Sequence, residues 1–191
     1  MVLGQNVDLI EKVKKKEPGA FDILYDEYKI QAYRTAVFLT GNEEDAQDVV
    51  QDTFVTVCLE IGKLKKPEAF ISWFYRILTH NAIRYIKKRK REIPRESLEE
   101  KFIKADSALW EDFTADLLRQ EENRQLRYLV DQLGEKYRTV VVLYYFNNFS
   151  VREIARITGC LEGTVKSRLF KARKLLEEKL TGKGGGKSDT A

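Results

Sequence analysis

The chain is poor in the residues that build metal centres, disulfides and most catalytic sites. Its 191 residues include two cysteines, Cys58 and Cys160, and one histidine, His80. Two thiols so far apart and a lone imidazole offer no metal-ligand spacing. No acidic cluster with such spacing lies beside a basic site, and no glycine-rich phosphate loop is present. We therefore predict that the protein is not an enzyme and uses no metal, no cofactor and no small-molecule substrate.

Long apolar runs and a leader segment are also missing. No stretch approaches the roughly 18 apolar residues of a membrane-spanning helix. Residues 1–13 are charged and lack the apolar core of a signal peptide. Both cysteines have apolar neighbours, which predicts buried free thiols in a reducing compartment. We expect a cytoplasmic protein.

Proline is rare, and the alternation of apolar and polar residues typical of strands is scarce. The three prolines are Pro18, Pro67 and Pro94. The fold class is therefore predicted to be all-α, with two small helical domains joined by a flexible linker. Apolar residues recur at helical spacing. This spacing predicts helices over residues 7–16, 20–39, 43–59, 69–91, 116–133 and 136–147, with Asn42 capping the third.

Changes in composition divide the chain into its expected domains. The regular apolar stripe is lost after residue 92, which indicates a linker over residues 93–115. This places a first domain at residues 1–92 and a second at residues 116–181. Residues 182–191 are rich in glycine and cannot bury a core, so we predict a disordered tail.

Residues 150–180 carry the pattern of a helix-turn-helix. Ser150 and Glu153 have the S-x-x-E form of a capping box. Gly159 suits a sharp helix end, because glycine enters the left-handed region without steric cost. A second helix from about residue 162 carries one apolar stripe. Two short helices joined by a glycine-containing turn can place the second helix in a DNA major groove.

The outward face of that second helix has side chains that suit DNA. Hydroxyls, cations and an exposed aromatic ring can contact base edges, phosphates and thymine methyl groups. An ordinary amphipathic helix with a solvated basic face is the alternative. The outward residues are Gly163, Ser167, Phe170, Lys171 and Lys174, flanked by Thr164 and Lys166.

Charge is modest in total but segregated along the chain. The formal net charge is +4, yet residues 42–62 contain acids and no base, whereas residues 84–91 contain bases and no acid. Such segregation suggests two different partners, a basic protein surface and a polyanion. Two solvated helix faces are the alternative. The basic run follows aromatic residues interleaved with cations, which resembles a platform for unstacked bases, although aromatic rings are more often core.

Three motifs in order resemble those of extracytoplasmic-function (ECF) sigma factors, compact bacterial sigma factors with two domains. DAQDVVQDTF over residues 45–54 is similar to the family's D-A-E-D-[LV]-V-Q-[ED]-x-F. FISWFYRI over residues 70–77 is similar to F-x-x-W-[LF]-Y-R-I. The third motif comprises LGEKYR, FSVREIA and EGTVKSRL over residues 133–138, 149–155 and 162–169.

The resemblance implies an alternative sigma factor that binds core RNA polymerase and directs promoter-specific transcription initiation. The first domain would dock on the coiled-coil clamp of the polymerase largest subunit, and it would also bind the minus-ten element as that element melts. The second domain would read the minus-thirty-five element as duplex DNA. A free-standing regulator that reads a palindrome as a dimer explains the helix-turn-helix but not the other two motifs.

The resemblance also implies three sets of site residues. The polymerase-binding set is Asp45, Asp48, Gln51, Asp52 and Phe54, of which Phe54 could instead be core. The minus-ten set is Trp73, Arg76, His80, Asn81, Arg84, Tyr85 and Lys88. The minus-thirty-five set is Arg152, Arg156, Thr164, Lys166, Ser167, Arg168, Phe170 and Lys171, of which Arg168 could instead form a structural salt bridge.

The chain departs from the family pattern at three places. His80, followed by Asn81, stands where the family often has asparagine, Gly134 replaces a proline, and Cys160 with Leu161 occupies a turn where I-P is common. The resemblance finally implies an anti-sigma factor, often membrane-anchored, that covers the polymerase and DNA surfaces and holds the chain inactive.

Overall fold

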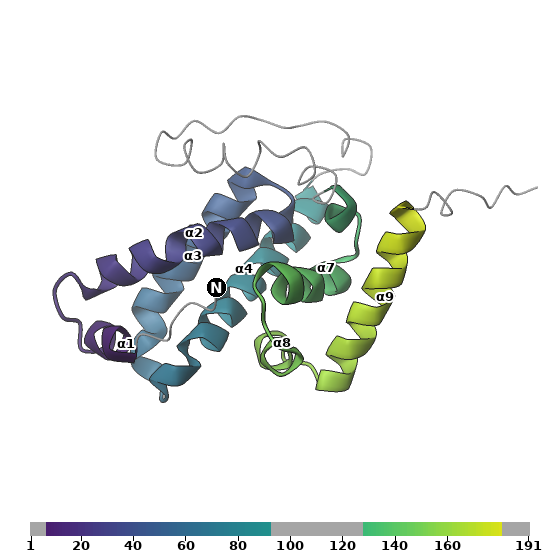
Figure 1. Ribbon diagram of the computed structural model, residues 1–191. Coiled ribbons are helices and arrows are strands. Elements are labelled where there is room, and N and C mark those ends of the chain that lie inside the picture. The colour runs from purple at the N-terminus through teal and green to yellow at the C-terminus, as the bar shows by residue number, and fades with distance from the viewer. Residues whose placement is uncertain (1–6, 93–127, 181–191) are drawn as a thin grey trace, which may run out of the picture.

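The first group of helices packs around a cluster of aromatic rings. The computed structural model describes residues 7–92 and 128–180, and every regular element in these ranges is helical (Figure 1). Helices α2, α3 and α4 contact one another pairwise. At their centre the Phe74 ring lies 5.6 Å from Tyr28 and 5.4 Å from Phe54, measured between centroids. The elements of this group are α1 (Val7–Lys14), α2 (Ala20–Thr40), α3 (Glu43–Glu60), η1 (Ile61–Lys63), η2 (Pro67–Ala69) and α4 (Phe70–Glu92).

Local signals fix the ends of these helices where the sequence predicts them. Asn42 caps α3, and its side chain accepts a hydrogen bond from the Asp45 backbone N–H at 2.8 Å. This bond satisfies one of the free N–H groups of the first turn. Gly41 ends α2 with φ 71°, and its N–H donates to the Val37 carbonyl. The turn between α2 and α3 is therefore set by two adjacent residues.

The second group of helices contains the predicted helix-turn-helix. Ser150 and Glu153 form the expected capping box, with the Ser150 N–H 2.8 Å from Glu153 Oε2. Gly159 ends α8 at φ 67°, as its position in the turn requires. Val165, Leu169 and Ala172 form the buried stripe of α9. The elements of this group are α7 (Glu135–Val141), η4 (Val142–Phe146), α8 (Val151–Thr158) and α9 (Glu162–Leu180).

The helix predicted over residues 136–147 forms over residues 135–146, but its second half is a π-helix. It begins as α7, but η4 is wound more widely, as a π-helix, and the Asn147 N–H donates to the Val142 carbonyl five residues back. The Phe149 N–H then bonds to the Leu143 carbonyl. This wider winding accompanies contacts of Phe146 and Asn147 with α2. The change of winding was not visible in the apolar spacing.

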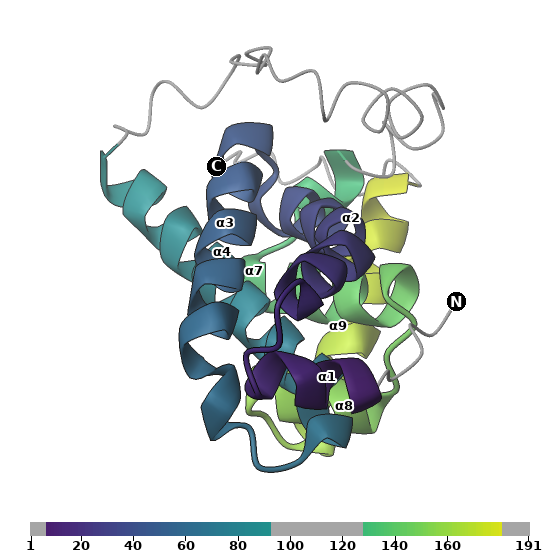
Figure 2. The same cartoon turned by 90° about the vertical axis from the view of Figure 1, so that its left-hand side faces the viewer.

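The two groups pack against each other through one continuous core. Helix α8 contacts α4, and η4 contacts α2. In Figures 1 and 2 the second group lies beside the first. The predicted linker, most of the predicted 116–133 helix and the predicted tail lie outside the described residues.

The prediction of buried thiols is wrong for Cys58. Its side chain is exposed, because it follows the inward-facing Val57 on α3 and therefore points about 100° away around the helix. Cys160 is partly exposed in the turn before α9. Across residues 7–92 and 128–180, no helix is both long and apolar enough to cross a membrane. The same residues contain no group of three or more potential metal ligands.

The burial of Tyr75 leads us to expect that the folded protein loses stability at alkaline pH. Its side chain is 1% exposed, and burial raises the pKa of its hydroxyl to about 12, against hydrogen bonds from Thr35 and Asn147 that lower it. The folded state therefore keeps this proton between about pH 10 and pH 12, where the unfolded chain has lost it. The free energy of unfolding should be unaffected below pH 10 and fall above it, by at most about 2–3 kcal/mol.

Denaturant unfolding from pH 9 to pH 11.5 checks this expectation. Tyr75→Phe should show a smaller fall with pH than the unmodified chain. Part of the fall should remain, because burial also raises the pKa of Tyr28. Tyr128→Phe is the matched control, since its side chain is 66% exposed. Equal slopes for the Tyr75 variant and the unmodified chain would contradict the assignment.

Candidate nucleic-acid and polymerase interfaces

The polar residues of the predicted polymerase-binding set on α3 divide into an outward pair and an inward pair. Asp48 and Gln51 are exposed to solvent. Asp45 and Asp52 are partly buried, because both face α4. Phe54, the fifth predicted member, is 4% exposed, and its ring lies 4.7 Å from Tyr25. The structure therefore places Phe54 in the core, the second of its two predicted roles.

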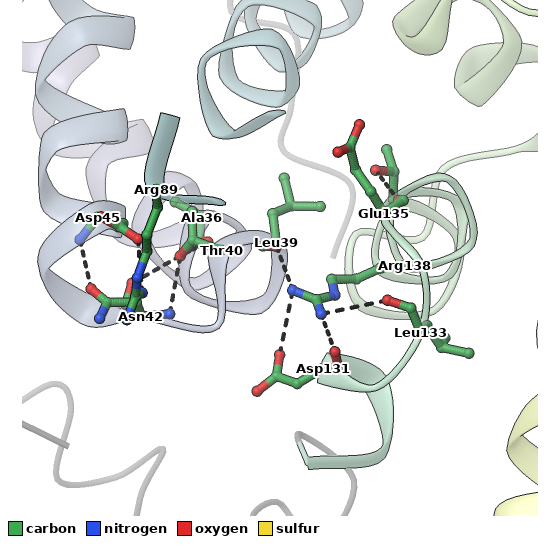
Figure 3. A network of polar contacts seen from close by, with 11 residues as sticks. Ala36, Leu39, Thr40, Asn42, Asp45, Arg89, Asp131, Leu133, Glu135 and Arg138 are labelled. Carbon is green, nitrogen blue, oxygen red and sulfur yellow. Dashed lines mark hydrogen bonds and ion pairs between the residues drawn. The ribbon is translucent and has the colours of Figure 1, made fainter. Parts of the chain in front are cut away.

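The inward acids bind the basic half of α4. Asp52 Oδ2 lies 2.6 Å from Arg84 Nη2 and accepts a hydrogen bond from the Tyr85 hydroxyl at 3.1 Å. Burial and this carboxylate together raise the pKa of Tyr85. Asp45 Oδ2 lies 3.1 Å from Arg89 Nη1, as Figure 3 shows. Each exposed ion pair is worth at most about 1 kcal/mol, but together they orient the cations of α4 relative to α3.

A basic groove runs along the outward side of α4. Its volume is about 560 Å³. The cations recur at intervals of three or four residues, so they line one face of the helix. Positive charge beside apolar side chains suits the backbone and bases of a single strand. The groove is lined by His80, Ile83, Arg84, Lys87, Lys88 and Arg91.

The remaining members of the minus-ten set lie on different sides of α4. Arg76 is exposed, whereas Trp73 is partly buried with its ring 6.1 Å from Phe70. Asn81 is 5% exposed, and its Nδ2 donates to Thr53 Oγ1 at 3.2 Å. The structure thus brings His80, Arg84 and Lys88 to the groove, places Tyr85 against Asp52 of α3, and places Asn81 in the core between α3 and α4.

The outward face of α9 is exposed as the sequence predicts. Phe170 is 71% exposed, and Lys166, Ser167 and Lys171 are also exposed. Thr164 is partly buried, and its carbonyl accepts the Ser167 hydroxyl at 3.0 Å. The cations and the aromatic ring therefore form one solvent-facing surface on the second helix of the helix-turn-helix.

Arg168 and the arginines of α8 flank this surface. Arg168 is partly buried, and its Nη1 donates to Cys160 Sγ at 3.2 Å, which gives it a structural contact with the turn. Arg152 and Arg156 are exposed on α8. Exposed guanidinium groups beside a reading helix suit phosphates, which fix the position of a protein on DNA without specifying sequence.

Sequence reasoning left several of these residues out of the predicted sites. Lys87 and Arg91 line the groove of α4. Their helical spacing from Arg84 in the sequence could have indicated that they share its face. Arg138 and Asn147 contact the first group of helices, and no sequence signal indicated this. Such contacts join residues about 70 to 110 positions apart.

A helical module with an acidic face and a basic groove, next to a helix-turn-helix with an exposed reading helix, defines a two-module DNA-binding protein. Residues 24–92 match the family model of Sigma-70 region 2, and residues 123–176 match that of Sigma-70, region 4. The chain belongs to the family of ECF RNA polymerase sigma factors. It is a specificity subunit of transcription initiation that binds core RNA polymerase and promoter DNA.

Relatives cover nearly the whole chain. The ECF RNA polymerase sigma factor SigW of Bacillus subtilis is 32% identical over 182 residues, which cover 90% of this chain and 94% of the relative. The RNA polymerase sigma-H factor of Pseudomonas aeruginosa is 30% identical over 181 residues, with 92% and 94% covered.

Two solved structures share the fold. CnrH in complex with the cytosolic domain of CnrY aligns with a TM-score of 0.69 at 22% identity, covering 93% of this chain and 98% of the other. The sigma factor RpoE of Bartonella quintana, in complex with the anti-sigma factor NepR, aligns with a TM-score of 0.62 at 24% identity, with 84% and 97% covered.

Proposed function

We propose that three surfaces of this chain have different roles in promoter recognition. The exposed part of the acidic face of α3, with Asp48 and Gln51, docks on the polymerase. The basic groove of α4 binds the melted minus-ten strand. The outward face of α9 reads the minus-thirty-five element. The observation that carries the proposal is that all three surfaces are solvent-facing on one chain of sigma-factor fold.

The groove of α4 fits a single strand better than a duplex. Arg84 and Lys88 supply positive charge for phosphates, and Trp73 and Tyr85 lie on the same helix as partly exposed rings. Stacking of a base on an aromatic ring is worth about 1–3 kcal/mol, which offsets the few kcal/mol needed to unstack it. His80 lies in the groove wall. Asn81 is buried and is therefore not part of the proposed surface for the minus-ten strand.

The face of α9 fits the major groove of a duplex. Lys166, Lys171 and Ser167 can reach phosphates and base edges, and the Phe170 ring can contact a thymine methyl group. Arg152 and Arg156 would hold the backbone from α8. Arg168 would act through its contact with Cys160, which fixes the turn from which the reading helix starts.

We also propose that this chain performs no catalytic chemistry itself and that it is located in the cytoplasm. An anti-sigma factor is proposed to control it. One structural relative, the sigma factor RpoE, was solved in complex with the anti-sigma factor NepR, and another, CnrH, was solved with the cytosolic domain of CnrY. An apolar groove of about 510 Å³ between α2 and α3 adjoins the proposed docking face, and Gln51 and Val55 line it. An inhibitor that covers this region should compete with core polymerase in a binding assay. Simultaneous binding would argue against the shared surface.

Transcription in vitro tests the proposed function directly. Core RNA polymerase alone should initiate poorly at specific promoters, whereas core polymerase with this chain should start at a defined set of sites. Mapping the starts across genomic DNA should reveal two shared elements upstream. No change in the start sites on addition of the chain would refute the function. Starts that share only the minus-ten element would refute the role of α9.

A further inference from the structure

One carboxylate oxygen of α3 holds two consecutive residues of α4. Asp52 Oδ2 lies 2.6 Å from Arg84 Nη2, and it also accepts a hydrogen bond from the Tyr85 hydroxyl at 3.1 Å. The guanidinium carbon of Arg84 lies 5.7 Å from the centre of the Tyr85 ring. Consecutive residues of a helix point about 100° apart, so these two side chains need a shared partner to be held together. Asp52 is that partner.

The proposed minus-ten surface uses both of the side chains that Asp52 holds. Arg84 lines the basic groove together with His80 and Lys88. Its side chain is 57% exposed, and a guanidinium has five N–H donors, so donors that are not bound to Asp52 can reach a phosphate. The Tyr85 ring is partly exposed. Its hydroxyl stays protonated at neutral pH, because burial and the Asp52 carboxylate raise its pKa above the ordinary value.

A side chain that is already held in place binds a ligand more tightly than a freely rotating one. Arginine has one of the largest rotamer entropies of any side chain, and a ligand that immobilises it loses affinity by that amount. The ion pair with Asp52 restricts the rotamers of Arg84 before the strand arrives. The planar guanidinium then presents its remaining donors in fixed directions. Asp52 can therefore favour strand binding without touching the strand.

The charge of Asp52 acts in the opposite direction. A carboxylate near a bound phosphate repels it, which by itself would weaken strand binding. Salt screens this repulsion, because the Debye length is about 8 Å at physiological ionic strength. The entropy of a restricted side chain is not screened. We therefore expect positioning to prevail at physiological salt, and the two effects predict opposite results when the carboxylate is removed.

A second ion pair between the same two helices provides a comparison. Asp45 Oδ2 lies 3.1 Å from Arg89 Nη1 (Figure 3). Arg89 is not among the residues that line the basic groove. Both ion pairs join α3 to α4, but of the two only the pair of Asp52 includes a groove residue.

We propose that Asp52 is a positioning residue of the minus-ten surface, whose carboxylate fixes Arg84 and Tyr85 for the melted strand instead of docking on the polymerase. This changes the role of one member of the predicted polymerase-binding set. The inference rests on the proposed role of the α4 groove.

Alanine substitution of Asp52 tests the proposal in the holoenzyme, which is this chain bound to core polymerase. Holoenzyme formed at saturating core polymerase is titrated with a fluorescently labelled single strand that carries the minus-ten sequence of a start site mapped by transcription in vitro. Asp52→Ala should weaken strand binding by about fivefold, because two side chains lose their restraint. Affinity for core polymerase should stay within about twofold. The melting temperature should change little, because an exposed ion pair contributes little to stability.

Two other acids of α3 supply matched controls. Asp45→Ala breaks the comparison ion pair between α3 and α4, and it should leave strand binding within about twofold. Asp48→Ala should show the reverse of the Asp52 pattern. It should weaken binding to core polymerase and leave strand binding by the saturated holoenzyme unchanged, since Asp48 is exposed on the docking face.

A mutant cycle shows whether Asp52 acts through its two partners. Arg84→Gln and Tyr85→Phe, combined in one chain, should weaken strand binding on their own. Adding Asp52→Ala to that chain should then change strand binding by less than about twofold, because residues that act through one another have non-additive effects.

The outcomes separate the role of Asp52 from the proposed function. Unchanged or stronger strand binding by Asp52→Ala would overturn positioning and leave the proposed function intact. So would an equal loss in Asp45→Ala, or a fivefold effect that persists without both partners. A loss of core binding as large as the loss of strand binding would return Asp52 to the polymerase interface. Unchanged strand binding after Arg84→Gln and Tyr85→Phe together would instead refute the groove as the minus-ten surface, and the role of Asp52 with it.

Discussion

Replacing Asp48 by arginine is expected to weaken binding to core RNA polymerase by at least about tenfold. Asp48 is exposed on the acidic face of α3, whereas its neighbours Asp45 and Asp52 are engaged with α4. The proposed partner is a basic protein surface, and placing like charges together across an interface costs several kcal/mol. Equilibrium binding to purified core polymerase measures the effect, which should shrink as salt is raised.

A second charge reversal controls for net charge. Asp22 is exposed near the start of α2, so Asp22→Arg makes the same change in charge away from the acidic face. It should leave polymerase binding within about twofold. Equal losses in both variants would mean that overall charge, and not the α3 face, governs docking. Unchanged binding by Asp48→Arg would remove α3 from the interface.

Replacing Lys171 by alanine is expected to lower transcription from the cognate promoter by about tenfold while core binding stays intact. Lys171 is exposed beside Phe170 on the outward face of α9. A specific side-chain contact with DNA is worth about 1–3 kcal/mol, and a lost phosphate contact lowers the salt dependence of binding by about one unit of slope. In vitro transcription at several salt concentrations, with polymerase binding in parallel, measures both quantities.

Lys15 supplies the matched control for the reading helix. It is exposed just beyond α1, at the opposite end of the described chain from α9, so Lys15→Ala removes the same charge without touching α9. That variant should transcribe normally. If core binding by Lys171→Ala fell as much as transcription, and promoter choice did not change, the role assigned to α9 would be wrong.

The pairing of α3 with α4 bears on how the two activities of the first group are related. The sequence separates acids and bases into two runs, which suggested two independent partner surfaces. In the structure Asp52 holds Arg84 and Tyr85, and Asp45 holds Arg89. Substitution of either acid would therefore release cations beside the basic groove as well as alter the docking face. Asp48 is the more direct test of docking, because its carboxylate is exposed.

Local sequence determined much of the fold and of the reading helix. The Ser150–Glu153 capping box, the left-handed Gly159 and the Asn42 cap are all set by residues within one helical turn, and each forms as predicted. Helical spacing likewise predicted which side of α9 is buried, because the side of a helix that carries the apolar residues is the side that packs. The family motifs are also short segments of sequence, so they could be recognised without a structure.

Only the tertiary structure decided which predicted site residues are available to a partner. Helical spacing in the sequence indicates which residues share a helix face with Asn81 or with Phe54. The packing of α3 against α4 is what buries these two side chains. The same holds for Asn147 and Arg138, whose partners in the first group lie about 70 to 110 residues earlier in the chain. The pattern of apolar residues in the sequence determines the direction in which a side chain points from its own helix. Which other element lies against that side chain depends on the packing of the whole chain.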